Sequence, residues 1–105
     1  YDRERLIFAK DYLLKSMAMP PSLPELARIA GINEFKLKRG FKALFGETVF
    51  GYLAKARLEL AKKALEKGNQ TATEIAFELG FSSLQHFSAA FKKHFGISPS
   101  RFDQR

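Results

Sequence analysis

The stretch LKRGFKALFG, residues 37–46, decides the fold, because a similar string, FSAAFKKHFG, follows at residues 87–96. In both strings the large apolar residues recur three and four positions apart, which is the spacing of one face of an α-helix. Both strings end in glycine, which is typical of a helix C-terminus. A glycine inside a helix costs about 1 kcal/mol relative to alanine. Gly40 lies in the middle of the first string, beside Phe41, and the matching region of the second string holds Ala89 and Ala90. Small residues there allow close helix packing, so we expect Gly40 to be a packing residue.

The sequence around the two strings is repeated as well. Each string is preceded by a serine or threonine with a glutamate three residues later, the pattern of a capping box. A glycine then marks a turn, and a residue that can cap the next helix follows. The corresponding positions, in pairs along the chain, are Ser22 and Thr71, Gly31 and Gly80, Asn33 and Ser82, Phe41 and Phe91, and Phe45 and Phe95. Matched caps, turns and apolar positions indicate an internal duplication.

Each copy predicts a short helix, a tight turn and a longer helix, which is the outline of a helix-turn-helix unit. The longer helices are expected at about residues 34–45 and 83–95. In the second of them, we expect Leu84 to lie in the core with the phenylalanines that follow it.

Between the copies, residues 49–67 predict a helix about 28 Å long, with Leu60 on its apolar side. We therefore expect an all-α fold of about seven helices. Its parts are a first subdomain at 1–46, a linker helix at 47–68 and a second subdomain at 69–105.

The bulk composition narrows the class of protein. The 105 residues carry a net charge of +7, with a pI near 9.9, which favours a nucleic acid or an anionic membrane as partner. The absence of cysteine excludes disulfides and thiolate metal sites. No apolar run approaches the roughly 20 residues that span a bilayer.

The polar faces of the two longer helices carry few acids. In the first copy this face holds Phe35, Lys38, Arg39 and Lys42, with no carboxylate among them. In the second copy the outward positions are Ser82, Gln85, His86, Ala89 and Lys93. Cations gathered on one face, with glutamates elsewhere, are typical of a surface that meets phosphates.

With these motifs the chain resembles the DNA-binding domain of AraC/XylS-type bacterial transcription regulators. The strings that carry the resemblance are LARIAGINEFKLKRGFKALFG, YLAKARLELAKKAL and, most specifically, IAFELGFSSLQHFSAAFKKHFGISPSRF. The resemblance implies sequence-specific binding of a double-stranded DNA operator, in the bacterial cytoplasm at the nucleoid. It also implies two recognition helices in successive major-groove segments, which lie about 34 Å apart.

The resemblance implies further partners as well. RNA polymerase is a candidate partner, no cofactor is expected, and the family's effector-binding domain is not expected within these residues. The strings LKRGFKALFGETVFGYL and HFSAAFKKHFG are similar to the subgroup that controls siderophore and iron-uptake genes.

Carried over by position, the resemblance assigns DNA contacts to individual residues. The expected base contacts are Phe35, Lys38, Arg39, Gln85 and His86. The expected phosphate contacts are Ser22, Lys36, Lys42, Thr71, Ser82, Lys92 and Lys93. Ala89 stands where many members of the family have arginine, so we expect the first copy to dominate base specificity.

Three other interpretations compete with this one. An enzyme or metal site is disfavoured, because His86 and His94 have no third ligand or paired carboxylate at a suitable spacing. A membrane-surface protein would need broad apolar helix faces, which here are used by the repeated packing. A helical protein–protein interaction module, without base readout, would use Phe35 and Tyr52 as exposed anchors. For Phe35 the plainer alternative is a partly exposed core position. For Lys38 and Lys42 it is a solvated face or a phosphate contact without base readout, and for His86 a phosphate contact or a simple surface role.

Overall fold

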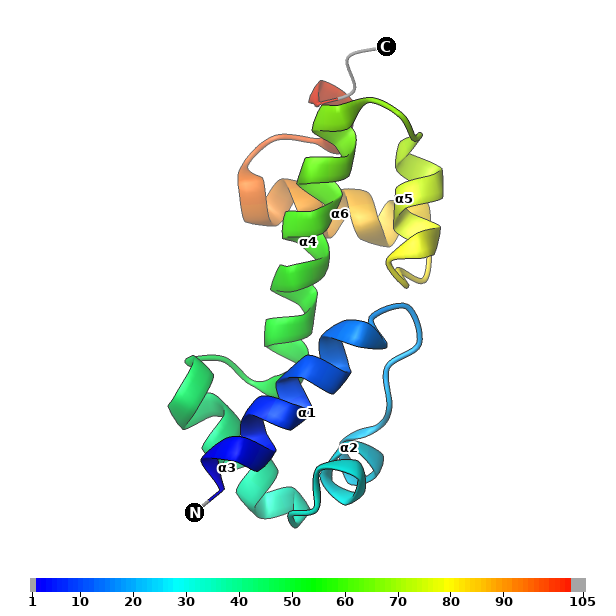
Figure 1. Ribbon diagram of the computed structural model, residues 1–105. Coiled ribbons are helices and arrows are strands. Elements are labelled where there is room, and N and C mark those ends of the chain that lie inside the picture. The colour runs from blue at the N-terminus through cyan, green and yellow to red at the C-terminus, as the bar shows by residue number, and fades with distance from the viewer. Residues whose placement is uncertain (1, 103–105) are drawn as a thin grey trace. The chain divides into compact units, whose positions relative to one another are not determined.

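The computed structural model describes residues 2–102, and every regular element in that range is helical (Figure 1). The elements are α1 (Arg3–Lys15), α2 (Leu23–Ala30), α3 (Glu34–Phe45), α4 (Val49–Lys67), α5 (Ala72–Glu78), α6 (Leu84–Phe95) and a 3-10 helix (Pro99–Arg101). The all-α prediction is therefore confirmed. The predicted subdomain limits at residues 1 and 105 lie outside the described residues.

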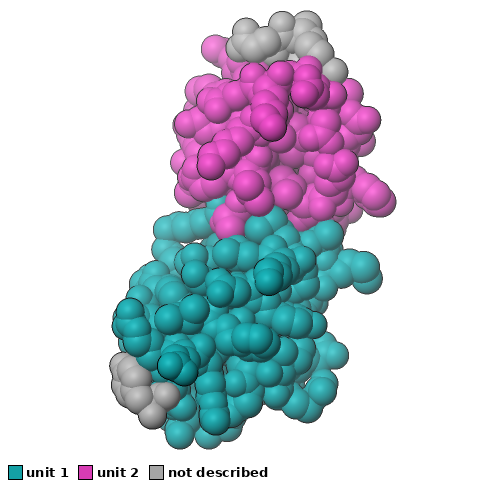
Figure 2. Space-filling model, in the orientation of Figure 1, with its two compact units in different colours: residues 1–55 teal, residues 56–105 magenta. Residues whose placement is uncertain are grey.

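By its internal contacts the chain divides into two units, Tyr1–Lys55 and Ala56–Arg105 (Figure 2). The division falls inside α4, so the start of this helix belongs to the first unit and the remainder to the second. The segment expected as a separate linker, residues 47–68, is thus shared between the two units.

In the first unit, α1 packs against both α2 and α3. It buries Leu6, Ala9 and Leu13, which recur three and four positions apart along one face. The other buried apolar residues of this unit are Met17, Leu26, Ala27, Ala30, Leu37, Phe41, Val49 and Leu53. Burying one large apolar side chain contributes about 1.5–3 kcal/mol, so this cluster holds α3 firmly against α1 and α2.

The second unit repeats this arrangement with α4 in the place of α1. Its core joins Leu58, Ala61 and Leu65 of α4 to two residues of α5 and two of α6. The residues from the shorter helices are Ile75, Ala76, Phe87 and Phe91. The spacing of the three α4 residues is the same as the spacing of Leu6, Ala9 and Leu13 in α1.

Aromatic contacts at the end of each longer helix are also repeated. The ring centroids of Phe41 and Phe45 are 4.6 Å apart, and so are those of Phe91 and Phe95. A third aromatic ring packs against each of these pairs. Tyr52 lies 5.6 Å from Phe41, and Phe102 lies 5.4 Å from Phe91. Because Tyr52 is half-buried in its group, its assignment as an exposed anchor of an interaction module is wrong.

The turns between the short and long helices explain two of the repeated glycines. Gly31 and Gly80 both adopt a positive φ, +78° and +89°, a conformation that L side chains rarely take. In both turns the residue after the glycine donates its backbone N–H to a carbonyl in the preceding helix. The pairs are Ile32 to Ala27, at 3.1 Å, and Phe81 to Ala76, at 3.0 Å.

The structure corrects three sequence-based predictions. The N-cap of α6 is Ser83 and not Ser82, because the Ser83 Oγ accepts the His86 backbone N–H at 3.0 Å. Leu84 is 38% exposed, since it lies in the first turn of α6, ahead of the buried Phe87. Leu60 is 45% exposed and Leu58 is buried instead, because the C-terminal part of α4 packs into the core of the second unit with a different side of the helix.

Candidate nucleic-acid interface

Helix α3 separates an apolar face from a cationic one. Asn33 begins it, with its Oδ1 accepting the Lys36 backbone N–H at 2.8 Å, and Gly46 ends it with φ +79°. Leu37 and Phe41 are fully buried on one side. The predicted base contacts Phe35, Lys38 and Arg39 are all exposed, and so is the predicted phosphate contact Lys42.

The exposed side of α3 carries three cations, Lys38, Arg39 and Lys42, and one acid, Glu34, in its first turn. Within residues 2–102, no carboxylate lies within 4.0 Å of the charged nitrogens of Lys38, Arg39 or Lys42. The Arg39 guanidinium carbon lies 5.4 Å from the Phe35 ring centroid, a cation–π contact that restrains both side chains. A shallow hollow of about 350 Å³ is bounded by Glu34, Phe35, Lys38 and Arg39. Three cations without a carboxylate partner in this range, and the contact between Phe35 and Arg39, suit the phosphates and bases of a DNA groove.

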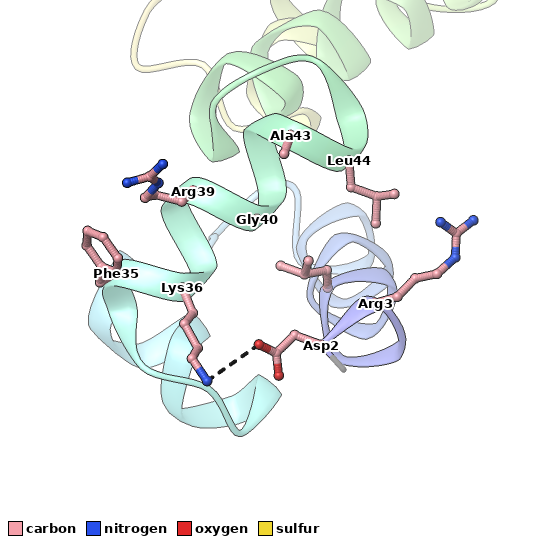
Figure 3. A pocket seen from close by; sticks show the side chains of 9 residues that line it. Asp2, Arg3, Phe35, Lys36, Arg39, Gly40, Ala43 and Leu44 are labelled. Carbon is pink, nitrogen blue, oxygen red and sulfur yellow. Dashed lines mark ion pairs between the residues drawn. The ribbon is translucent and has the colours of Figure 1, made fainter.

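Lys36 is placed differently from the other cations of α3. Its Nζ lies 3.7 Å from an Asp2 carboxylate oxygen (Figure 3). A second hollow, of about 400 Å³, lies here between α1 and α3, with Leu6, Gly40 and Leu44 among its lining residues. As a phosphate contact, Lys36 would therefore have to share its charge with Asp2.

Gly40 faces α1 rather than the exposed cations. A Cβ atom added at Gly40 would lie 2.8 Å from Leu6 Cδ1 and 3.2 Å from Leu6 Cδ2. Both distances are shorter than the roughly 3.5–4.0 Å at which carbon atoms attract. The expectation that Gly40 is a packing residue is therefore confirmed.

Helix α6 presents a more neutral face than α3. Phe87 and Phe91 are fully buried, whereas Gln85, His86 and Ala89 are exposed in the first half of the helix. Lys92 and Lys93 are exposed in its last turn. His94 does not join His86, because its Nε2 lies 3.3 Å from a Glu59 carboxylate oxygen on α4.

The two short helices begin in capping boxes that already use their N-terminal groups. Ser22 donates its backbone N–H to the Glu25 carboxylate at 3.0 Å, and Thr71 donates in the same way to Glu74 at 2.8 Å. The bonds from Ser22 lower the pKa of the Glu25 carboxyl. A DNA phosphate at Ser22 or Thr71 would compete with these carboxylates, so both assignments stay predictions.

Sequence reasoning missed two arginines that hold the turns. Arg5 of α1 donates from Nη1 to the Gly31 carbonyl at 2.9 Å. Arg57 of α4 lies over the ring of Phe81, with its guanidinium carbon 5.7 Å from the centroid. Partial burial lowers the pKa of Arg57. The pattern RLxxAK, shared by residues 5–10 and 57–62, was the available signal.

Two kinds of feature are absent from the part of the chain that the structure describes. There, no group of three His, Cys, Asp or Glu side chains is placed to hold a metal ion. Nor does any helix within residues 2–102 combine the length and the apolar character needed to cross a membrane.

Comparison with known proteins assigns the family. A family model described as a helix-turn-helix domain matches residues 26–105. The probable transcription factor PqrA of Proteus vulgaris is 38% identical over 77 residues, which are 73% of this chain and 63% of PqrA. An AraC-type DNA-binding domain protein from Chromobacterium violaceum superposes with a TM-score of 0.87 at 28% identity, over 96% of this chain and 90% of that one.

The chain belongs to the AraC-type helix-turn-helix DNA-binding domains. The DNA-binding domain of AdpA, solved in complex with a target DNA, shares the fold of this AraC-type domain. Its TM-score is 0.85 at 23% identity, over 94% of this chain and 89% of that one. The chain spans about half the length of the curated relatives it matches.

Proposed function

We propose that the chain reads a DNA operator with two recognition helices, α3 and α6, each in its own major-groove segment, as part of a bacterial transcription regulator. The exposed face of α3 carries this proposal: Lys38, Arg39 and Lys42 have no carboxylate partner within residues 2–102. AdpA, which shares the fold, was solved with a target DNA.

The individual contacts form part of the proposal. Lys38 or Arg39 donates to guanine O6 and N7, Phe35 presses on a thymine methyl, and Gln85 pairs with adenine. Lys42, Lys92 and Lys93 contact phosphates, so affinity should fall steeply with salt. Since Ala89 has no hydrogen-bonding group, the first unit supplies most of the base readout and the second relies more on DNA shape.

Selection of bound sequences from a random duplex pool tests the architecture. Enrichment of two sequence boxes, with centres one helical turn apart, is the expected outcome. Enrichment of no sequence, from a folded protein, would refute sequence-specific binding and favour an interaction module.

Alanine variants then test the assignment of contacts. At the selected site, Lys38→Ala and Arg39→Ala should each weaken binding by about 1–3 kcal/mol and relax preference at one base pair. Lys15→Ala, which removes an exposed cation at the end of α1, is the matched control and should change affinity little. Larger losses for Gln85→Ala and His86→Ala than for these two variants would reverse the ranking of the units.

The wider biology rests on the same proposal. The regulator acts at the nucleoid, contacts RNA polymerase, and responds through an effector-binding domain outside these residues. Control of iron-uptake genes is the most specific part, and it rests on the similarity of residues 37–53 and 86–96 to that subgroup. Transcription from a promoter bearing the selected site, with and without iron, tests it.

A further inference from the structure

Ser82 has no counterpart in the first unit. In the first turn, Gly31, Ile32 and the cap Asn33 follow one another. In the second turn, Gly80 and Phe81 match Gly31 and Ile32 in their backbone bonds, but the cap of the next helix is Ser83. The second turn is therefore one residue longer, and Ser82 is the added residue.

The added residue meets the side chain of His86. The Ser82 Oγ lies 3.2 Å from His86 Nδ1, and the ring of Phe81 stands edge-on to the imidazole, at 5.8 Å between centroids. The backbone N–H of His86 is used separately, by Ser83 Oγ at 3.0 Å. The imidazole of the exposed His86 is thus held from its Nδ1 side, and within residues 2–102 no hydrogen-bond partner lies at Nε2.

A hydrogen bond at Nδ1 decides what Nε2 can do. A neutral imidazole carries one proton, so if Nδ1 accepts a bond, Nε2 is a donor. The serine hydroxyl can donate to Nδ1 by rotation about its C–O bond. We propose that Ser82 is a positioning residue that donates to Nδ1 and holds His86 as an Nε2–H donor toward an acceptor atom of the DNA.

This inference rests on the proposed function and deepens it by naming the chemistry that His86 takes. Several DNA atoms accept but do not donate: the phosphate oxygens, and in the major groove guanine N7 and O6, adenine N7 and thymine O4. The position that corresponds to His86 in α3 is Lys36, whose ammonium group can only donate. The opposite tautomer would place an acceptor at Nε2, which repels phosphates and suits the amino groups of cytosine or adenine.

Nitrogen NMR on the ¹⁵N-labelled domain tests the tautomer without DNA. At about pH 8, above the ordinary pKa of imidazole, the His86 spectrum should show a protonated Nε2 and an unprotonated Nδ1. Ser82→Ala should change this pattern, Ser82→Thr should retain it, and the signals of His94 should not move. An Nδ1-protonated His86 in the parent domain, or a pattern unaffected by Ser82→Ala, would overturn the inference.

A double-mutant cycle tests the consequence for binding. Ser82→Ala should weaken duplex binding roughly two- to tenfold in the parent and leave it unchanged in the His86→Ala background. An equal loss in both backgrounds would mean that Ser82 contacts DNA by itself, and would overturn its positioning role. Failure of the parent to bind any duplex would refute the proposed function, while the NMR result would stand separately.

Duplex variants identify the acceptor. If His86 contacts a base, the loss from His86→Ala should be greatest when one position holds a base with a major-groove acceptor (guanine, adenine or thymine) and vanish with cytosine there. If His86 contacts a phosphate, the loss should be equal for all bases and vanish when one phosphate near α6 is replaced by a methylphosphonate. Either result supports a donor at Nε2, whereas a loss that is greatest with cytosine would overturn it.

Discussion

Replacing Gly40 by alanine separates helix propensity from packing in α3. The substitution should stabilise the helix by about 1 kcal/mol through propensity. The new Cβ, however, would lie 2.8 and 3.2 Å from the two methyl carbons of Leu6, and 3.5 Å from its Cγ. The Cγ distance is an ordinary contact, but both methyl carbons are too close, so the Leu6 side chain must change its rotamer or shift to admit the new Cβ.

The two effects have different sizes. Overpacking in a core typically costs about 1–3 kcal/mol. The hollow that Leu6 and Gly40 line offers room for the displaced side chain, but Leu6, which is 6% exposed, would meet water there. We therefore expect Gly40→Ala to lower the free energy of unfolding by about 1 kcal/mol after the gain in propensity.

A cycle with Leu6→Ala gives the sharpest measurement. Leu6→Ala alone should cost about 2–5 kcal/mol. In that background Gly40→Ala meets no methyl groups, so it should stabilise by about 1 kcal/mol, which makes the coupling about 2 kcal/mol. Urea unfolding followed by far-ultraviolet circular dichroism measures all four proteins. Stabilisation by Gly40→Ala in the parent, or the same effect in both backgrounds, would refute the packing role.

Two further substitutions examine helix N-termini. Ser83→Ala should destabilise the domain by about 1 kcal/mol, because it removes the cap of α6, and thermal unfolding should show no comparable loss for the neighbouring Ser82→Ala. Glu25→Gln should lower the melting temperature near neutral pH. Since the folded pKa of Glu25 lies below its ordinary 4.5, the stabilisation is present above that value and is lost as the pH falls through the folded pKa. The difference from the parent should therefore shrink on acidification, and a difference that is constant with pH would contradict the role of the ionised carboxylate.

The sequence was most informative where a local pattern determines local structure. The capping boxes at Ser22 and Thr71 form as predicted, because each involves only a residue and its third neighbour. The outline of α3 and its exposed cations follows from helical periodicity in the same way. These features require no knowledge of which segments pack together.

Predictions that depended on contacts distant in sequence were weaker. Ser82 and Ser83 are equally good caps by type, and the path of the turn decided between them. Leu60 was expected to be buried because one apolar stripe was assumed along the whole of α4. That helix instead contributes Val49 and Leu53 to one core and Leu58 to another, so no single periodic stripe describes it.

The extent of the duplication follows from this division of α4. Arg5 and Arg57 both hold a turn. Lys10 lies 5.7 Å from the ring of Phe45, and Lys62 lies 5.4 Å from the ring of Phe95. The repeated unit therefore consists of three helices. In the first unit α1 packs against α2 and α3, and in the second the C-terminal part of α4 packs against α5 and α6. On the proposed function, the units differ in what each helix would present to DNA. Within residues 2–102, α3 has three exposed cations without a carboxylate partner, and α6 has a histidine whose Nδ1 lies 3.2 Å from the Oγ of the added Ser82.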